Sequence, residues 1–138
     1  MNEMKQLYIA LFLLMSALVT SCGNREAERI MDSAEDVMWT RPDSALTALE
    51  SIDTLALKTK SQRARYSLLY TMALDRNHLT IQDLRVIKPA ASYYENHGSN
   101  DDKMKMYFYL GTAQYDTGDP EAAITSYLRA KEYSSRSD

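Results

Sequence analysis

The stretch from Met104 to Ser137 constrains the fold more than any other part of the chain. It predicts two short amphipathic helices joined by a tight Gly-Asp-Pro turn at residues 118–120. Because Gly111 and Ala123 have small side chains, we expect two helix backbones to cross closely there, with an aromatic ring on either side. The residues expected at this helix–helix contact are Tyr107, Leu110, Gly111, Ala123, Tyr127 and Ala130.

One such helix pair cannot bury its apolar face alone, so the upstream chain is expected to supply two further pairs. Residues 26–53 carry apolar residues at helical spacing in two runs, which an Arg-Pro-Asp segment at 41–43 separates. In this first pair we expect Thr40 to cap the second helix, with Asp43 reaching back to it and a proline in the first turn.

The middle pair is less regular. Thr59 and Gln62 form a capping-box pattern, which predicts the start of a helix that runs to about residue 75. The apolar pattern stops at 76–79 and restarts at 80, continuing to about residue 97. Since Pro89 lies inside this second run and lacks a backbone N–H, we expect the helix to kink or split near Ile87.

These patterns predict an all-α fold of about six helices in three antiparallel pairs, stacked as a short α-solenoid within residues 22–138. Ser99 is expected to cap the first helix of the last pair. A chain of 138 residues suffices for one domain, and only four Gly and three Pro imply few turns. The formal net charge of −3 provides no basic face, so nucleic-acid binding is not expected.

The last 34 residues resemble a tetratricopeptide repeat, in which an aromatic residue, a Leu-Gly pair, an Ala and a second aromatic recur at set places. The six contact residues named above occupy those places, whereas Gln114 stands where an aromatic residue is usual and Tyr115 follows it. The resemblance implies that the domain at 22–138 is a helical-repeat array whose best-formed repeat is 104–137.

The same resemblance implies a binding groove, because one face of each first helix lines the concave side of such arrays. On the last repeat that face would present Lys105, Phe108, Thr112, Tyr115 and Asp116. One cation, two aromatic rings and small polar groups suit a peptide or a glycan better than a metal ion. The many tyrosines leave two interpretations open: they seal the seams between helix pairs, or they form part of a ligand surface.

Residues 1–21 predict a signal peptide. Lys5 precedes an uncharged run from Leu7 to Val19, which is shorter than the roughly 20 residues that span a bilayer but typical of a signal-peptide core. The sequence Val-Thr-Ser-Cys that ends at Cys22 resembles the lipobox of bacterial lipoproteins, in which the Cys receives diacylglycerol and becomes the new N-terminus. Cys22 is the only cysteine, so an intrachain disulfide is excluded.

Two alternatives to this lipidated N-terminus stay open. The first is an ordinary secretory signal with an incidental Cys, and the second is a buried apolar first helix. In the lipoprotein interpretation, residues 23–25 form a short tether before the first helix.

A wider resemblance covers several motifs along the chain. Arg-Pro-Asp-Ser-Ala-Leu at 41–46, Arg-Tyr-Ser-Leu-Leu at 65–69, Ala-Ser-Tyr-Tyr-Glu at 91–95 and Tyr-Leu-Gly at 109–111 are similar to helical-repeat lipoproteins of Bacteroidetes. This resemblance implies a lipid anchor at Cys22 and a place in the bacterial cell envelope, on its periplasmic or cell-surface side.

No motif indicates an enzyme. The chain has no CxxC, HExxH, phosphate-binding glycine loop or GxSxG sequence. His78 and His97 are expected in a turn and at a helix end, rather than as metal ligands. We therefore expect no catalytic residue, no metal and no cofactor.

The function that these patterns favour is a membrane-anchored adaptor that binds an envelope protein or peptide by surface complementarity. Two alternatives remain: the extracytoplasmic sensor portion of a longer regulator with such repeats, and a glycan-binding lipoprotein. Because no polar capping helix follows the final repeat, self-association through Tyr127, Tyr133 and their neighbours is also expected.

Overall fold

The computed structural model describes the backbone of residues 2–136 and the side chains of residues 4–9 and 25–136. Throughout that part of the chain the fold is helical and contains no strand, which confirms the all-α prediction. The elements are α1 (Asn2–Val37), α2 (Pro42–Glu50), η1 (Thr54–Ala56), α3 (Lys60–Arg76), η2 (Leu84–Val86), α4 (Lys88–Tyr94), α5 (Asn100–Asp116) and α6 (Pro120–Ser134), where η denotes a short 3₁₀ helix.

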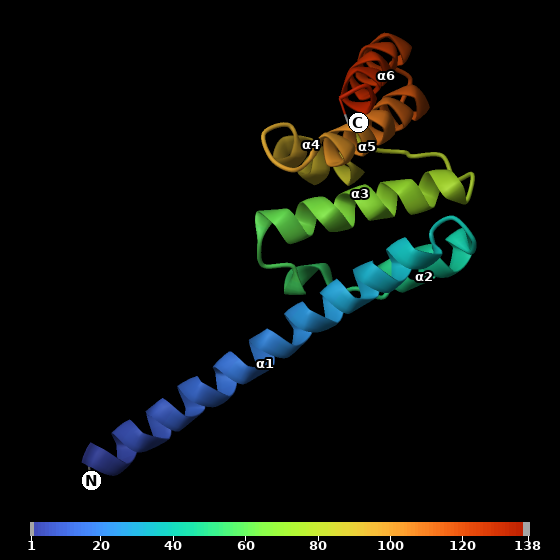
Figure 1. Ribbon diagram of the computed structural model, residues 1–138. Helices are drawn as coiled ribbons and strands as arrows, with labels where there is room; N and C mark the ends of the chain where they lie inside the picture. Colours follow the sequence, from blue (N-terminus) through green and yellow to red (C-terminus); the bar gives the residue numbers. More distant parts are fainter. Residues whose placement is uncertain (1, 137–138) are drawn as a thin grey trace.

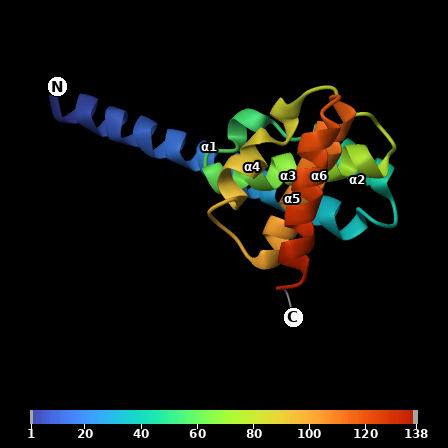
Figure 2. The same cartoon turned by 90° about the horizontal axis from the view of Figure 1, so that it is seen from above.

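Consecutive helices pack as pairs: α1 with α2, α3 with α4, and α5 with α6. The first helices of the pairs also contact in order, because α3 packs on both α1 and α2, and α5 packs on both α3 and α4 (Figure 1). The N-terminal part of α1 extends away from the remaining helices in both views (Figure 2). Residues 23–25, where a tether was expected, continue the backbone of α1 without a break.

The core lies where the pairs meet. In the first apolar run, Ala34 on α1 and Met38 directly after it are fully buried, whereas Ile30 and Val37 are half-buried. The largest side chains with almost no exposed surface come from every pair and from the loop after α3; they are Met31, Met38, Leu49, Ile81, Ile87 and Met106. Burial of a side chain of this size stabilises the fold by about 1.5–3 kcal/mol.

Local polar contacts set the starts of α3 and α5, as the sequence predicted. The Thr59 hydroxyl accepts a hydrogen bond from the Gln62 backbone N–H at 3.1 Å, and the Gln62 side-chain oxygen accepts one from the Thr59 N–H at 3.2 Å. Ser99 and Asp102 form the same reciprocal arrangement at the start of α5. Each capping box satisfies two backbone groups that the helix leaves unpaired.

The predicted cap at Thr40 is wrong. The chain turns tightly after α1, with the backbone N–H of Thr40 and that of Arg41 both donating to the carbonyl of Val37. Since α2 begins at Pro42, Arg41 occupies the capping position and makes no side-chain capping bond. The turn, rather than a side-chain cap, therefore fixes the start of α2.

The predicted interruption at Pro89 is confirmed. Residues 80–83 are not helical, η2 ends at Val86, and α4 starts at Lys88 with Pro89 in its first turn, where the missing N–H costs nothing. Ser67 on α3 holds this break in place, because its hydroxyl donates to the Val86 carbonyl at 2.5 Å and accepts from the Ala90 N–H at 3.3 Å. The run expected to kink or split near Ile87 is thus a short 3₁₀ helix followed by a short α-helix.

The last pair is antiparallel, as its cross-helix contacts show. Gln114 pairs with Ser126 near the turn, Gly111 faces Tyr127, and Tyr107 stacks on Tyr133 farther along. Gly111 is buried, and a Cβ placed on it would lie 2.7 Å from a ring carbon of Tyr127. The close approach predicted at Gly111 therefore exists, with the Tyr127 ring as the group that needs the space.

We expect the substitution Gly111→Leu to lower the free energy of unfolding by about 1–3 kcal/mol, because the added side chain overlaps the Tyr127 ring. Thermal unfolding followed by circular dichroism measures this loss. The double variant Gly111→Leu/Tyr127→Ala should lose less than the sum of the two single variants, since removing the ring relieves the overlap. If the double variant instead loses as much stability as the two single variants together, the Tyr127 ring does not oppose the new side chain.

Candidate functional site

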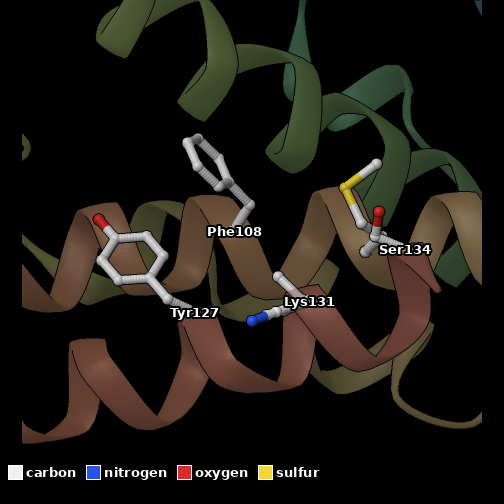
Figure 3. A pocket seen from close by; sticks show the side chains of 6 residues that line it. Phe108, Tyr127, Lys131 and Ser134 are labelled. Atoms are coloured by element: carbon white, nitrogen blue, oxygen red, sulfur yellow. The ribbon is translucent and has the colours of Figure 1, made fainter.

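An open, mainly apolar hollow lies between α5 and α6. Its volume is about 460 Å³, and its lining residues are Met104, Phe108, Tyr127, Ala130, Lys131 and Ser134. Figure 3 shows Phe108 on α5 and Tyr127 and Lys131 on α6 along one open surface. Lys131 is the one charged side chain in this lining. A volume of this size matches that of small-ligand clefts, although the hollow is a surface depression and not an enclosed cavity.

Aromatic side chains form one wall of the hollow. The Phe108 ring lies 5.6 Å from the Tyr127 ring and 5.1 Å from the Tyr109 ring, measured between centroids. Tyr109 is buried, whereas Phe108 keeps 44% of its surface exposed. The buried ring therefore supports the exposed one, and the wall is held in place before any ligand arrives.

Further apolar side chains extend this surface beyond the hollow. Ile124 and Leu128 are 61% and 58% exposed, and with Lys131 they lie at spacing i, i+4 and i+7 on one side of α6. Tyr115 on α5 is 66% exposed. We call the hollow together with these exposed apolar residues the α5–α6 face. Exposed apolar patches of this kind mark interaction surfaces more often than isolated apolar residues do.

The other helix pairs show what covers an equivalent surface. Each second helix carries an Ala followed four residues later by a large residue: Ala45 and Leu49, Ala90 and Tyr94, Ala123 and Tyr127. Leu49 and Tyr94 are buried, and in each case the next first helix packs on that pair. Tyr127 is half-buried, because no further helix among the described residues packs on α5 and α6.

The predicted groove residues separate into two groups. Lys105 pairs with Asp101 at 2.7 Å and faces a different, smaller hollow between the first helices. Asp116 accepts a hydrogen bond from the Ile81 backbone N–H at 2.8 Å, which ties the loop after α3 to the end of α5. Both side chains therefore have structural partners.

The other predicted groove residues lie at or near the α5–α6 face. Phe108 lines the hollow, and Tyr115 is exposed near it. The Thr112 hydroxyl accepts a hydrogen bond from the Tyr127 hydroxyl at 3.3 Å, so it orients that ring. The groove prediction named residues of α5 only. Of these, Phe108 lines the hollow, together with residues of α6 that the prediction did not include.

Of the residues predicted at the contact between the last two helices, Tyr107, Gly111 and Tyr127 make cross-helix contacts, whereas Leu110 lines a hollow with residues of α4. Tyr107, Gly111, Ala123 and Ala130 are buried, while Leu110 and Tyr127 are partly buried. The Tyr107 ring stacks on Tyr133 at 5.7 Å, and its hydroxyl accepts a hydrogen bond from Arg129 at 3.3 Å. Tyr107 and Tyr133 therefore seal the seam between α5 and α6. One face of the Tyr133 ring thus already packs within its own chain.

A charged cluster joins α1 to α3, and the sequence reading missed it. Arg65 contacts Glu28, Asp32 and Glu35 at 3.1, 2.8 and 2.7 Å. Burial lowers the pKa of Arg65, but its hydrogen bonds to Glu35 and Asp32 outweigh that effect and hold the pKa above the ordinary value. The three acids lie at helical spacing on one face of α1, which is the sequence signal that could have indicated a basic partner.

Burial changes the pKa of two tyrosines of the core. Burial, together with a smaller effect of the nearby carboxylate of Asp102, raises the pKa of Tyr94 to about 12. Burial also raises the pKa of Tyr109 to about 12, with a contribution from Asp75. Both hydroxyls are therefore neutral across the physiological pH range and contribute packing rather than acid–base chemistry.

The raised pKa values predict a loss of stability at alkaline pH. The unfolded chain releases these phenolic protons near pH 10, whereas the folded chain retains them up to about pH 12. The unfolded state thus binds fewer protons in this window, so the free energy of unfolding falls as the pH rises. In urea unfolding at about pH 9 and about pH 11, the Tyr94→Phe/Tyr109→Phe variant should lose less stability than the parent chain. An equal loss in both proteins would refute the assignment.

Two further expectations concern anchoring and metals. The Cys22 side chain lies outside the described residues, so the predicted lipidation site is not placed here. Within the described part of the chain, no helix has the length and apolar character needed to cross a bilayer. The same residues contain no group of three or more His, Cys, Asp or Glu side chains arranged to hold a metal ion.

Comparison with known proteins gives no match: no family model, no curated protein and no solved structure corresponds to this chain.

Proposed function

We propose that this protein is a helical-repeat adaptor of the tetratricopeptide type, and that its α5–α6 face binds an amphipathic helix of another cell-envelope protein. The observation that carries the proposal is the exposure of this face. It carries an aromatic wall and exposed apolar side chains, whereas the matching surfaces of the first two pairs are covered. An apolar groove that receives an amphipathic helix is a recurrent mode of peptide recognition.

The chain itself indicates what kind of partner fits. The surface formed by α1 and α2 is covered by the helix α3, and the surface formed by α3 and α4 is covered by the helix α5. Both covering helices bring apolar residues to the contact, such as Leu68 on α3 and Met106 on α5. A helix with one apolar side continues this series, and an acidic residue near its contact side would pair with Lys131.

The place of action in this proposal is the bacterial cell envelope, with the mature chain beginning at Cys22 and held to the membrane by lipid on that residue. The support is the lipobox-like sequence that ends at Cys22, after an apolar run with a preceding Lys5. More than one acyl chain on a single residue gives stable anchoring, whereas one chain gives only marginal binding. The adaptor would thus present its partner close to the membrane surface.

Site-specific photo-cross-linking tests the adaptor proposal. A benzophenone amino acid replaces Phe108 in the full chain, and native envelopes that contain the variant are irradiated. We expect one partner protein to be captured, with the cross-linked segment carrying apolar residues at i, i+3 or i+4 spacing. The same amino acid at Leu55, which is 79% exposed but lies on η1, is the matched control and should not capture that partner.

A second substitution tests whether the captured partner packs on the α5–α6 face or only lies near it by chance. Leu128→Glu places a carboxylate on the face, and we expect it to reduce the cross-linking yield at Phe108 about tenfold, because the apolar contact would bury that charge. Leu55→Glu should leave the yield unchanged. Capture of the same proteins from position 108 and from position 55 would refute the proposal. Capture of only a second copy of this chain would also refute it and would indicate self-association.

A further inference from the structure

A second hollow lies between the first turn of α3 and the exposed side of α4. Its volume is about 370 Å³, and its lining residues are Lys60, Arg63, Pro89, Ser92, Tyr93 and His97. It shares no residue with the hollow of the α5–α6 face, so one can be altered without the other. Its walls come from two different helices, which the α3–α4 contact holds together.

The cations of this hollow lack acidic partners. Among the described residues, no carboxylate lies within ion-pair distance of Lys60 or Arg63. Arg65, two residues along the same helix, contacts three carboxylates. In a chain with a net charge of −3, two cations that no described carboxylate pairs with favour a local positive potential at the hollow.

The structure orients the arginine toward a defined position. One terminal nitrogen of Arg63, Nη1, donates to the Leu57 carbonyl at 2.8 Å and to the Lys58 carbonyl at 3.1 Å. The guanidinium is planar and has further N–H donors on its other nitrogens, which remain available to an oxyanion. Lys60 is one helical turn away at i−3, so its ammonium group reaches the same side of α3.

The opposite wall offers a flat apolar surface with polar groups at its edge. The His97 ring stacks on the Tyr93 ring at 4.3 Å with an angle of 6° between the planes, and Pro89 lies in the same lining. The His97 Nδ1 is 2.8 Å from the Tyr93 carbonyl oxygen; because a carbonyl only accepts, Nδ1 is the protonated nitrogen. The Ser92 hydroxyl donates to no other described residue.

We propose that this hollow binds a small organic anion in which a carboxylate is attached to a flat ring. The carboxylate lies between Lys60 and Arg63, where two charge-assisted hydrogen bonds are available. The ring packs against Pro89 and Tyr93, and the Ser92 hydroxyl contributes a further hydrogen bond. Both features are needed for this ligand class. The cationic pair alone would bind any small anion, and the apolar wall alone would bind a neutral ring.

The test uses three probes that separate the two requirements. Benzoate carries both the charge and the ring, acetate carries only the charge, and benzyl alcohol carries only the ring. Amide chemical shifts of the ¹⁵N-labelled full chain in detergent micelles report binding residue by residue. We expect benzoate to shift the amides of residues 60, 63, 92, 93 and 97 in a saturable way, with acetate and benzyl alcohol binding at least about tenfold more weakly.

A charge-matched pair of variants locates the site. Lys60→Gln should weaken benzoate binding about tenfold, the loss expected for one charge-assisted hydrogen bond. Lys58→Gln is the control, because the Lys58 ammonium donates to the Leu55 carbonyl at 2.7 Å and does not line the hollow. Both lysines are exposed, and thermal unfolding of both variants checks that the fold is retained.

Two results would overturn the proposal. One is that acetate and benzoate change the same amide chemical shifts to the same extent, at all exposed Lys and Arg residues. The other is equal benzoate affinity in the Lys60→Gln and Lys58→Gln proteins.

Discussion

The structure depends on one constraint: each helix pair has an apolar side that the pair cannot bury by itself. The first pair is covered by α3 and the second by α5, so Leu49 and Tyr94 lie in the core. Tyr127 follows Ala123 at the same four-residue spacing in the last pair but stays half-buried. Among the described residues, the first two pairs are thus each covered by the next helix, whereas no helix covers the α5–α6 face. This is the physical reason to propose a helix as its partner.

The charges are distributed as unevenly as the apolar groups. Three acids of α1 converge on Arg65 and tie the first helices of two pairs together. On the same helix, Lys60 and Arg63 have no carboxylate of the described residues within ion-pair distance. The apolar hollow on the last pair and the cationic hollow on the middle pair therefore differ in chemistry.

Local signals in the sequence were the reliable ones. The capping box at Thr59, the cap at Ser99 and the break at Pro89 were predicted correctly because each depends on residues within one or two turns. The cap at Thr40 failed because the turn after α1 is tighter than the capping pattern assumes, and Arg41 takes the capping position. The break also shortened α4, since Ser67 holds the Val86 carbonyl and the Ala90 N–H across the interruption.

The sequence by itself determined the helical class, the closely packed last pair and the small residue opposite Tyr127, because helical periodicity and side-chain size are local properties. Only the tertiary structure decided which groove residues are free. Lys105 and Asp116 share the predicted face with Phe108, yet Asp101 and the Ile81 N–H occupy them. The Ile81 contact joins residues far apart in the chain, and the cationic hollow likewise forms only when α4 folds back onto the start of α3. Such long-range pairings depend on how the pairs stack, which no single segment encodes.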